Sequence, residues 1–165
     1  MKTFAIALLV VGLLGTALAG SGDRGFGVGL ASGAVSGICA KYWVSQKLAL
    51  DATVGAGYFY WRGLTADAAF AVHDYGFWSS LFNEELPGKW PFYYGGGVSV
   101  GVHTWGYNRW NSTVHTGVYV KVGTAFIPDD MPLDFFVEPG LGLYLLPTPY
   151  IAGAGKVGVR YWIGE

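Results

Sequence analysis

The sequence predicts an all-β fold, an eight-stranded antiparallel up-and-down transmembrane β-barrel, from three observations. Of 165 residues, 27 are Gly, 17% are aromatic and only 13% are charged, whereas soluble domains carry about 25% charged residues. Apolar residues alternate with small or polar ones in one segment after another, which is the period of a β-strand. After residue 19, no uninterrupted apolar stretch reaches the roughly 18 residues of a membrane-spanning helix. A hydrophobic chain of this kind can cross a bilayer only as a closed barrel.

The first 19 residues are predicted to be a signal peptide. Lys2 supplies the positive start, an apolar run covers residues 4–14, and Ala17-Leu18-Ala19 places small residues at a cleavage site. The apolar run is too short to span a membrane as a helix. We therefore expect an exported chain with a signal peptide at 1–19 and one barrel domain at 20–165.

Four strands are expected in the first half of the domain. In each strand, one set of alternate residues is apolar, and the other set consists mainly of small or polar residues with at most one charge. The segments "SGAVSG", "SQK" and "WRGL" separate these strands with residues that favour turns. The strands are expected within residues 25–30, 38–44, 50–61 and 65–73.

Four more strands are expected in the second half, within residues 94–103, 114–123, 132–147 and 156–163. Short connections imply antiparallel neighbours, and strands of about 8 to 13 residues suit a tilted bilayer crossing. Pro139 interrupts the seventh segment, where a bulge near the start of the strand would accommodate it. Residues 75–91 are expected either to extend the fourth strand or to form a short amphipathic helix at a barrel rim.

The small number of charges decides which face of the strands points inward. A soluble lipocalin-like barrel has an apolar interior and a charged exterior, whereas a membrane barrel has the reverse arrangement. With at most two charges per strand, the chain cannot cover a wet exterior, so the polar faces are assigned to the lumen. This lumen then holds a balanced ionic network that fills a narrow barrel, namely Lys41, Asp51, Asp67, Lys121, Asp134, Glu138, Lys156 and Arg160.

Aromatic residues concentrate near the expected strand ends. Membrane barrels carry aromatic girdles at both bilayer interfaces, so these residues are interpreted as the two girdles. The set comprises Tyr42, Trp43, Tyr58, Tyr60, Trp61, Trp90, Phe92, Tyr93, Tyr94, Trp105, Trp110, Phe135, Phe136, Tyr161 and Trp162.

This plan resembles the small eight-stranded outer-membrane barrels of Gram-negative bacteria, of the OmpA/OmpX-like type. A closer resemblance is to uncharacterised outer-membrane barrel proteins, through "AKYW" at 40–43, "LD" at 50–51, "PFYYG" at 91–95, "PLDFFVE" at 132–138 and "GVRYW" at 158–162. The resemblance implies a porin-like monomer in the bacterial outer membrane, with a structural or surface role. It also implies outer-membrane lipid and the barrel-assembly machinery as partners.

No catalytic site, cofactor or metal site is predicted. His73, His103 and His115 fall on the expected lumen face and could in principle bind zinc, but the polar network would satisfy them equally well. Cys39 is the only cysteine, so no intrachain disulfide can form. A formal charge of −1, from 10 basic and 11 acidic residues, gives no sign of a nucleic-acid partner.

Two alternative functions are kept. The first is a lipid-modifying enzyme with serine–histidine acyl chemistry, for which the candidate pairs are His73 with Ser79 or Ser80, and His103 with Ser99. Lipid A deacylases, which resemble this plan, carry a tight His-x-Ser motif that the chain lacks. The second alternative is a soluble, lipocalin-like ligand-binding barrel.

Overall fold

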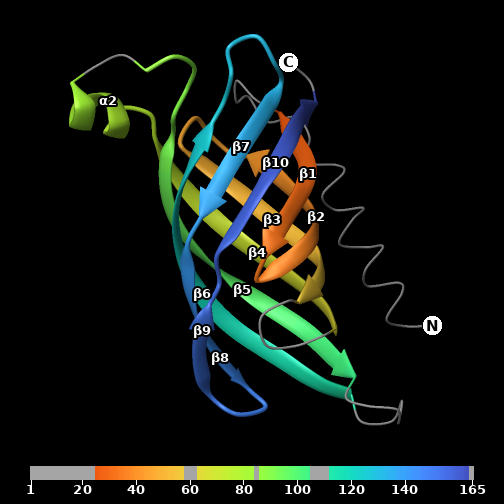
Figure 1. The fold of residues 1–165 in the computed structure, drawn as a ribbon. Helices are drawn as coiled ribbons and strands as arrows, with labels where there is room; N and C mark the ends of the chain where they lie inside the picture. Colours follow the sequence, from red (N-terminus) through yellow and green to blue (C-terminus); the bar gives the residue numbers. More distant parts are fainter. Residues whose placement is uncertain (1–24, 58–62, 84–85, 105–111, 164–165) are drawn as a thin grey trace.

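A computed structural model describes residues 25–57, 63–83, 86–104 and 112–163. Figure 1 shows an antiparallel sheet curled into a barrel, with one short helix beside it. In chain order the elements are β1 (Phe26–Gly33), β2 (Val35–Trp43), β3 (Leu48–Gly57), β4 (Gly63–Asp74), α2 (Phe77–Phe82), β5 (Phe92–Thr104), β6 (Ser112–Phe126), β7 (Leu133–Glu138), β8 (Gly140–Leu146), β9 (Tyr150–Gly153) and β10 (Lys156–Ile163).

The sheet closes because its last strand pairs with its first. Neighbouring strands are antiparallel from β1 to β6, then β6 pairs with β7, β7 with β10, and β10 with β1. The closing pair runs from Phe26 opposite Ile163 to Gly33 opposite Lys156. Since β7 and β8 are halves of one strand, and β9 and β10 halves of another, the ten segments form eight barrel strands. The predicted all-β, eight-stranded, up-and-down antiparallel barrel is confirmed.

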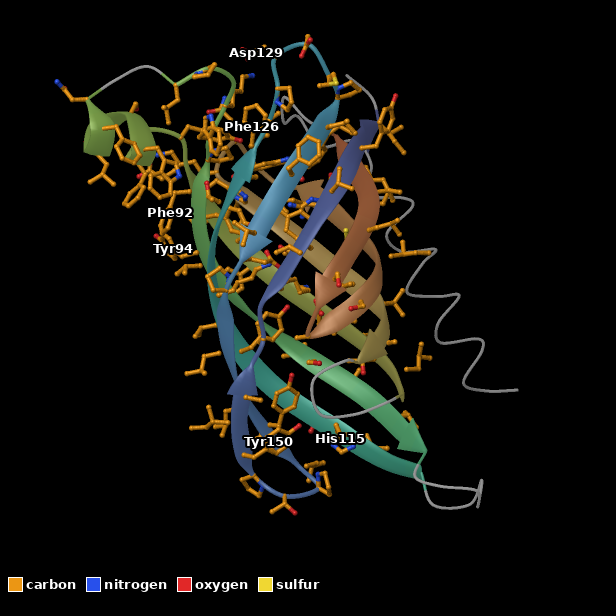
Figure 2. All side chains as sticks on the ribbon, viewed as in Figure 1. Phe92, Tyr94, His115, Phe126, Asp129 and Tyr150 are labelled. Carbon is orange, nitrogen blue, oxygen red and sulfur yellow. The ribbon has the colours of Figure 1, made fainter. Side chains whose placement is uncertain are left out.

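Side chains alternate between the two faces of the wall along most of each strand. On β6, Val118 and Val120 are exposed, whereas Tyr119 and Lys121 between them are buried. The same period continues through β7 and β8, where every second residue from Phe135 to Leu145 is exposed. Figure 2 shows the side chains projecting from both faces of the strands. The apolar face therefore points outward and the polar face inward, as the sequence predicts.

Two glycines make room for aromatic rings inside the barrel. A Cβ atom on Gly123 would lie 2.7 Å from the Tyr93 ring, and one on Gly158 would lie 2.6 Å from the Phe136 ring. Real Cβ atoms do not come this close to ring carbons, so a side chain at either position would displace the ring. The narrow lumen therefore alternates glycine with large rings, and the interior is filled.

The two ends of the barrel differ. The α2 end holds the start of β1, the end of β10, helix α2 and the connection at 127–132, whereas the far end holds Ala34 and the connection at 147–149. Within the described part of 75–91, the chain does not extend the fourth strand, since β4 ends at Asp74 and a short helix, α2, follows at the rim. No helix in the described ranges is long and apolar enough to cross a membrane.

Several strand boundaries differ from the expected ones. The segment expected to separate the first two strands shrinks to Ala34, since β1 reaches Gly33 and β2 begins at Val35. Gly33 adopts a φ of 146°, which L side chains rarely adopt, and its amide donates to Ser36 Oγ at 3.1 Å. The eighth strand begins at Tyr150, earlier than expected, and breaks between β9 and β10.

Pro139 interrupts the seventh strand between β7 and β8. A proline has no amide hydrogen to donate, but its carbonyl accepts from the Val122 amide at 3.1 Å. The bulge expected near the start of this strand therefore appears as a break that leaves the barrel closed. The predicted signal peptide at 1–19 lies outside the described residues and stays a prediction.

The girdle prediction is wrong for four aromatic residues, which lie inside the barrel. Trp43, Tyr93, Phe136 and Trp162 are all buried, because they occupy the lumen-facing positions of their strands. Nearness to a strand end therefore does not place a side chain on the outer wall. Five other aromatics of the predicted girdles fall outside the described residues, namely Tyr58, Tyr60, Trp61, Trp105 and Trp110.

Candidate functional site

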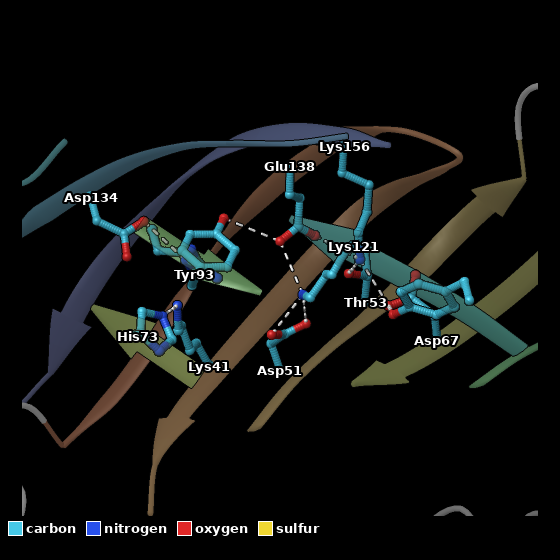
Figure 3. Close-up of polar contacts among 12 residues, drawn as sticks. Lys41, Asp51, Thr53, Asp67, His73, Tyr93, Lys121, Asp134, Glu138 and Lys156 are labelled. Atoms are coloured by element: carbon cyan, nitrogen blue, oxygen red, sulfur yellow. Dashed lines mark hydrogen bonds and ion pairs between the residues drawn. The ribbon is translucent and has the colours of Figure 1, made fainter. Parts of the chain in front are cut away.

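The charged side chains in the lumen form the candidate site. They come from β2, β3, β4, β6, β7 and β10, and Figure 3 shows most of them together in the interior. All eight residues assigned to the lumen from the sequence are buried, namely Lys41, Asp51, Asp67, Lys121, Asp134, Glu138, Lys156 and Arg160. Their four positive and four negative formal charges balance.

Lys121 is the centre of the first cluster. Its Nζ donates to both carboxylate oxygens of Asp51, at 2.7 Å and 2.8 Å, and to Glu138 Oε2 at 3.0 Å. The Tyr93 hydroxyl donates to the same Glu138 oxygen at 3.2 Å. Because charged hydrogen bonds strengthen where water is excluded, this cluster joins β3, β6 and β7 through the interior.

Lys156 is the centre of the second cluster. Its Nζ donates to Asp67 Oδ1 and to Thr53 Oγ1, both at 2.8 Å, and the Tyr119 hydroxyl donates to the same Asp67 oxygen at 3.1 Å. Glu138 Oε1 lies 3.5 Å from Lys156 Nζ. Glu138 therefore bridges the two clusters, since its other oxygen accepts from Lys121.

Arg160 and Asp134 form a third cluster between adjacent strands. They are directly opposite each other in the pairing of β10 with β7, and Arg160 Nε donates to Asp134 Oδ1 at 3.0 Å. The guanidinium also lies over the Phe136 ring, 3.9 Å from its centroid. A planar cation on an aromatic face is favourable, especially where water is excluded.

Lys41 is held in a different way from the other lumen cations. No ion pair joins it to a carboxylate in the described ranges of the chain; its Nζ lies 2.7 Å from His73 Nε2. A protonated lysine can only donate, so Nε2 accepts and Nδ1 donates to the Lys47 carbonyl, at 3.3 Å. The rings of Trp43 and Tyr93 also face the ammonium, at 5.2 Å and 4.7 Å.

Sequence reasoning had not placed three neutral partners in this network, namely Thr53, Tyr93 and Tyr119, whereas His73 was expected on the lumen face among the polar groups. These three residues also occupy lumen-facing positions of their strands, so the alternation would have found them. Tyr93 was assigned to a girdle because of its nearness to a strand end. The chemistry of the assembled network is electrostatic, because its groups neutralise one another and link strands that do not pair in the sheet.

The described histidines lie far apart in the lumen. His73 pairs with Tyr93 of β5, and His115 pairs with Gly101 of the same strand. These partners are eight residues apart, which is about 26 Å at 3.3 Å per residue. The side chain of His103 lies outside the described ones. Among the described residues, no group of three or more His, Cys, Asp or Glu side chains could hold a metal ion.

The structure does not bring His73 together with Ser79 or Ser80. The ring nitrogens of His73 contact Lys41 and Lys47, whereas the Ser79 hydroxyl donates to the Gly76 carbonyl at 3.1 Å. Both serines are exposed on α2. The pair of His103 with Ser99 is untested, because the side chain of His103 is not described.

We compared the chain with protein-family models, with curated proteins and with solved structures, and none of the three comparisons found a match.

Proposed function

We propose that the chain is an integral outer-membrane β-barrel protein of structural or surface-associated role, with a lumen plugged by polar side chains. The distribution of charge carries this proposal. The described strands contain nine charged residues, of which eight are the buried lumen residues named above. The ninth, Asp74, is the last residue of β4. The outer wall between the strand ends is therefore free of charge in the described ranges.

This arrangement is favourable only if the surroundings of the barrel are apolar. Soluble proteins place roughly a quarter to a third charged residues on their surface, but this wall exposes Leu64, Val120 and Ile151 by about two thirds each. A fully buried aliphatic side chain gains about 1.5 to 3 kcal/mol over an exposed one. Acyl chains around the wall would provide that gain at many positions. Closure of the sheet also pairs the strand edges within the chain, apart from β9, which among the described strands pairs with β8 alone.

The location and partners of the barrel are part of the same proposal. A predicted signal peptide and the resemblance to OmpA/OmpX-like barrels favour the bacterial outer membrane. The expected partners are outer-membrane lipid and the barrel-assembly machinery. The protein is expected to act as a monomer, because the wall closes within one chain through the pairing of β1 with β10.

A structural role is favoured over ligand binding or catalysis because the lumen groups engage one another. Lys121, Lys156 and Glu138 each hold two or more polar partners. A lipocalin-like barrel would need an apolar interior, but the inward face here is charged. These groups are arranged to stabilise the barrel.

Folding of the purified full chain in detergent tests the proposal. We expect β-structure to form when the unfolded chain is diluted into detergent micelles, and the unboiled sample to migrate differently from the boiled one on a gel. In buffer without detergent we expect aggregation, because the outer wall would face water. A folded, monomeric, soluble chain in plain buffer would contradict the proposal and would favour the soluble-barrel alternative.

A further inference from the structure

Helix α2 lies against the outer wall of the barrel and does not cover its mouth. The Phe77 ring stacks on Phe92 with centroids 4.3 Å apart, and Trp78 Nε1 donates to Thr124 Oγ1 at 2.9 Å. Phe92 and Thr124 occupy outward-facing positions, since their neighbours Tyr93 and Ala125 are buried in the lumen. Figure 1 shows the helix displaced to the side of the barrel at the α2 end.

The helix exposes an apolar surface that water would not stabilise. Its sequence "FWSSLF" contains no charged residue, and none of its side chains is buried. Leu81 and Phe82 are 62% and 56% exposed. A helix of six residues is far shorter than the roughly 12 to 15 residues that isolated helices need in water. We name Phe77, Trp78, Leu81, Phe82 and Phe92 the rim platform.

The rim platform is continuous with a belt of outward-facing aromatic side chains around the α2 end. Tyr94 continues the platform along β5 and is exposed. On the other strands Phe26 is opposite Tyr42, and Phe126 is opposite Phe135. Tyr161 of β10 is exposed at the same end. Belts of Tyr, Trp and Phe at one height are typical of the boundary between lipid headgroups and acyl chains.

We propose that the rim platform is an interfacial membrane anchor, which lies at the headgroup–acyl boundary of the leaflet at the α2 end. Leu81 and Phe82 would enter the acyl region to a shallow depth, as the apolar faces of interfacial helices do. The occupant is lipid, because the belt continues to β1, β2 and β10, and a second copy seated on α2 could not cover these strands. The inference rests on the proposed function, since it requires a bilayer around the wall.

Depth-dependent fluorescence quenching tests the anchor in the full chain. Leu81→Cys, Val120→Cys and Asp129→Cys are each prepared with Cys39→Ser, labelled with an environment-sensitive fluorophore and folded into phosphatidylcholine vesicles. Asp129 is an exposed residue of the 127–132 connection at the α2 end, and Figure 2 shows it beyond Phe126. The lipids carry bromine either near the ester bond or near the chain end. Gel migration checks that each variant folds. If Cys39→Ser misfolds, the three cysteine variants are prepared with Cys39 retained, because this thiol is buried in the folded barrel.

We expect the label at position 81 to be quenched more by shallow bromines than by deep ones. The label at 120 should show the reverse order, and the label at 129 should respond to neither lipid. Loss of quenching at 81 alone would overturn the anchor and leave the membrane barrel standing. Loss of quenching at 120 would overturn the proposed function. Energy transfer between labels at 81 that rises with the protein-to-lipid ratio would show a second copy on the platform, and would also overturn the anchor.

Discussion

Val120→Arg is expected to destabilise the folded barrel in a bilayer, lowering its free energy of unfolding by about 2 to 4 kcal/mol. Val120 lies on the outer face of β6, six residues from both Phe126 and Val114, which share that face. It is 65% exposed, among the most exposed apolar side chains of the wall. A guanidinium at this height would face acyl chains far from either rim. A urea titration of the chain in lipid vesicles, followed by tryptophan fluorescence, measures the difference.

Two variants control for this substitution. Val120→Leu keeps an apolar side chain on the lipid-facing wall and is expected to change stability little. Asp129→Arg adds the same guanidinium to an exposed connection, where water solvates it, and should behave like the natural chain. If Val120→Arg unfolded at the same urea concentration as Val120→Leu, the outward face of β6 would not be in contact with lipid.

Lys121→Met is expected to destabilise the barrel by about 3 to 5 kcal/mol, the usual cost of removing one partner from a buried ion pair. The side chain of Lys121 is almost completely buried, and its ammonium contacts both Asp51 and Glu138. Methionine fills similar volume without charge, so the change would leave two carboxylates close together and short of a cation. The urea titration in vesicles measures this loss directly.

A second substitution separates charge from packing. Lys121→Met combined with Asp51→Asn removes one carboxylate along with the cation, and is expected to recover a substantial part of the lost stability. Lys89→Met, at an exposed lysine of the α2 end, should leave stability unchanged. A result in which Lys121→Met and Lys89→Met unfold alike would remove Lys121 from any role in holding the lumen together.

The barrel was predictable because each strand meets two different environments. An alternation such as that of Val118, Tyr119, Val120 and Lys121 is expected where one face of a strand contacts apolar surroundings and the other face lines a closed interior. The same alternation assigned all the lumen charges. The number of strands followed from the turn-forming residues between these segments.

The pairing inside the lumen was not predictable, because it depends on the register of strands that are distant in the sequence. Lys41 of β2 contacts His73 of β4, and no local pattern links these two residues. The aromatic residues show a different limit. Trp43 and Trp162 were placed by their nearness to strand ends, but their position in the alternation decides. Both rings point into the lumen, where Trp43 lies opposite Ala49 and Trp162 opposite Gly27. The position of the turn at Ala34 was not predictable, because Gly and Ser occur both in the strands and in the loops of this chain. The segment "SGAVSG" was therefore assigned to a loop, although most of it belongs to β1 and β2.

The central claim, that the valine and leucine face of the wall touches lipid while the charges pack inside, can be measured with nuclear Overhauser effects. In lipid nanodiscs, the methyl groups of Val118, Val120 and Leu143 are expected to show transfer from acyl-chain protons. If those methyl groups instead showed no transfer from lipid, and showed transfer to methyl groups on strands that do not pair with β6 or β8, such as Val54 of β3, the orientation of every strand proposed here would be contradicted.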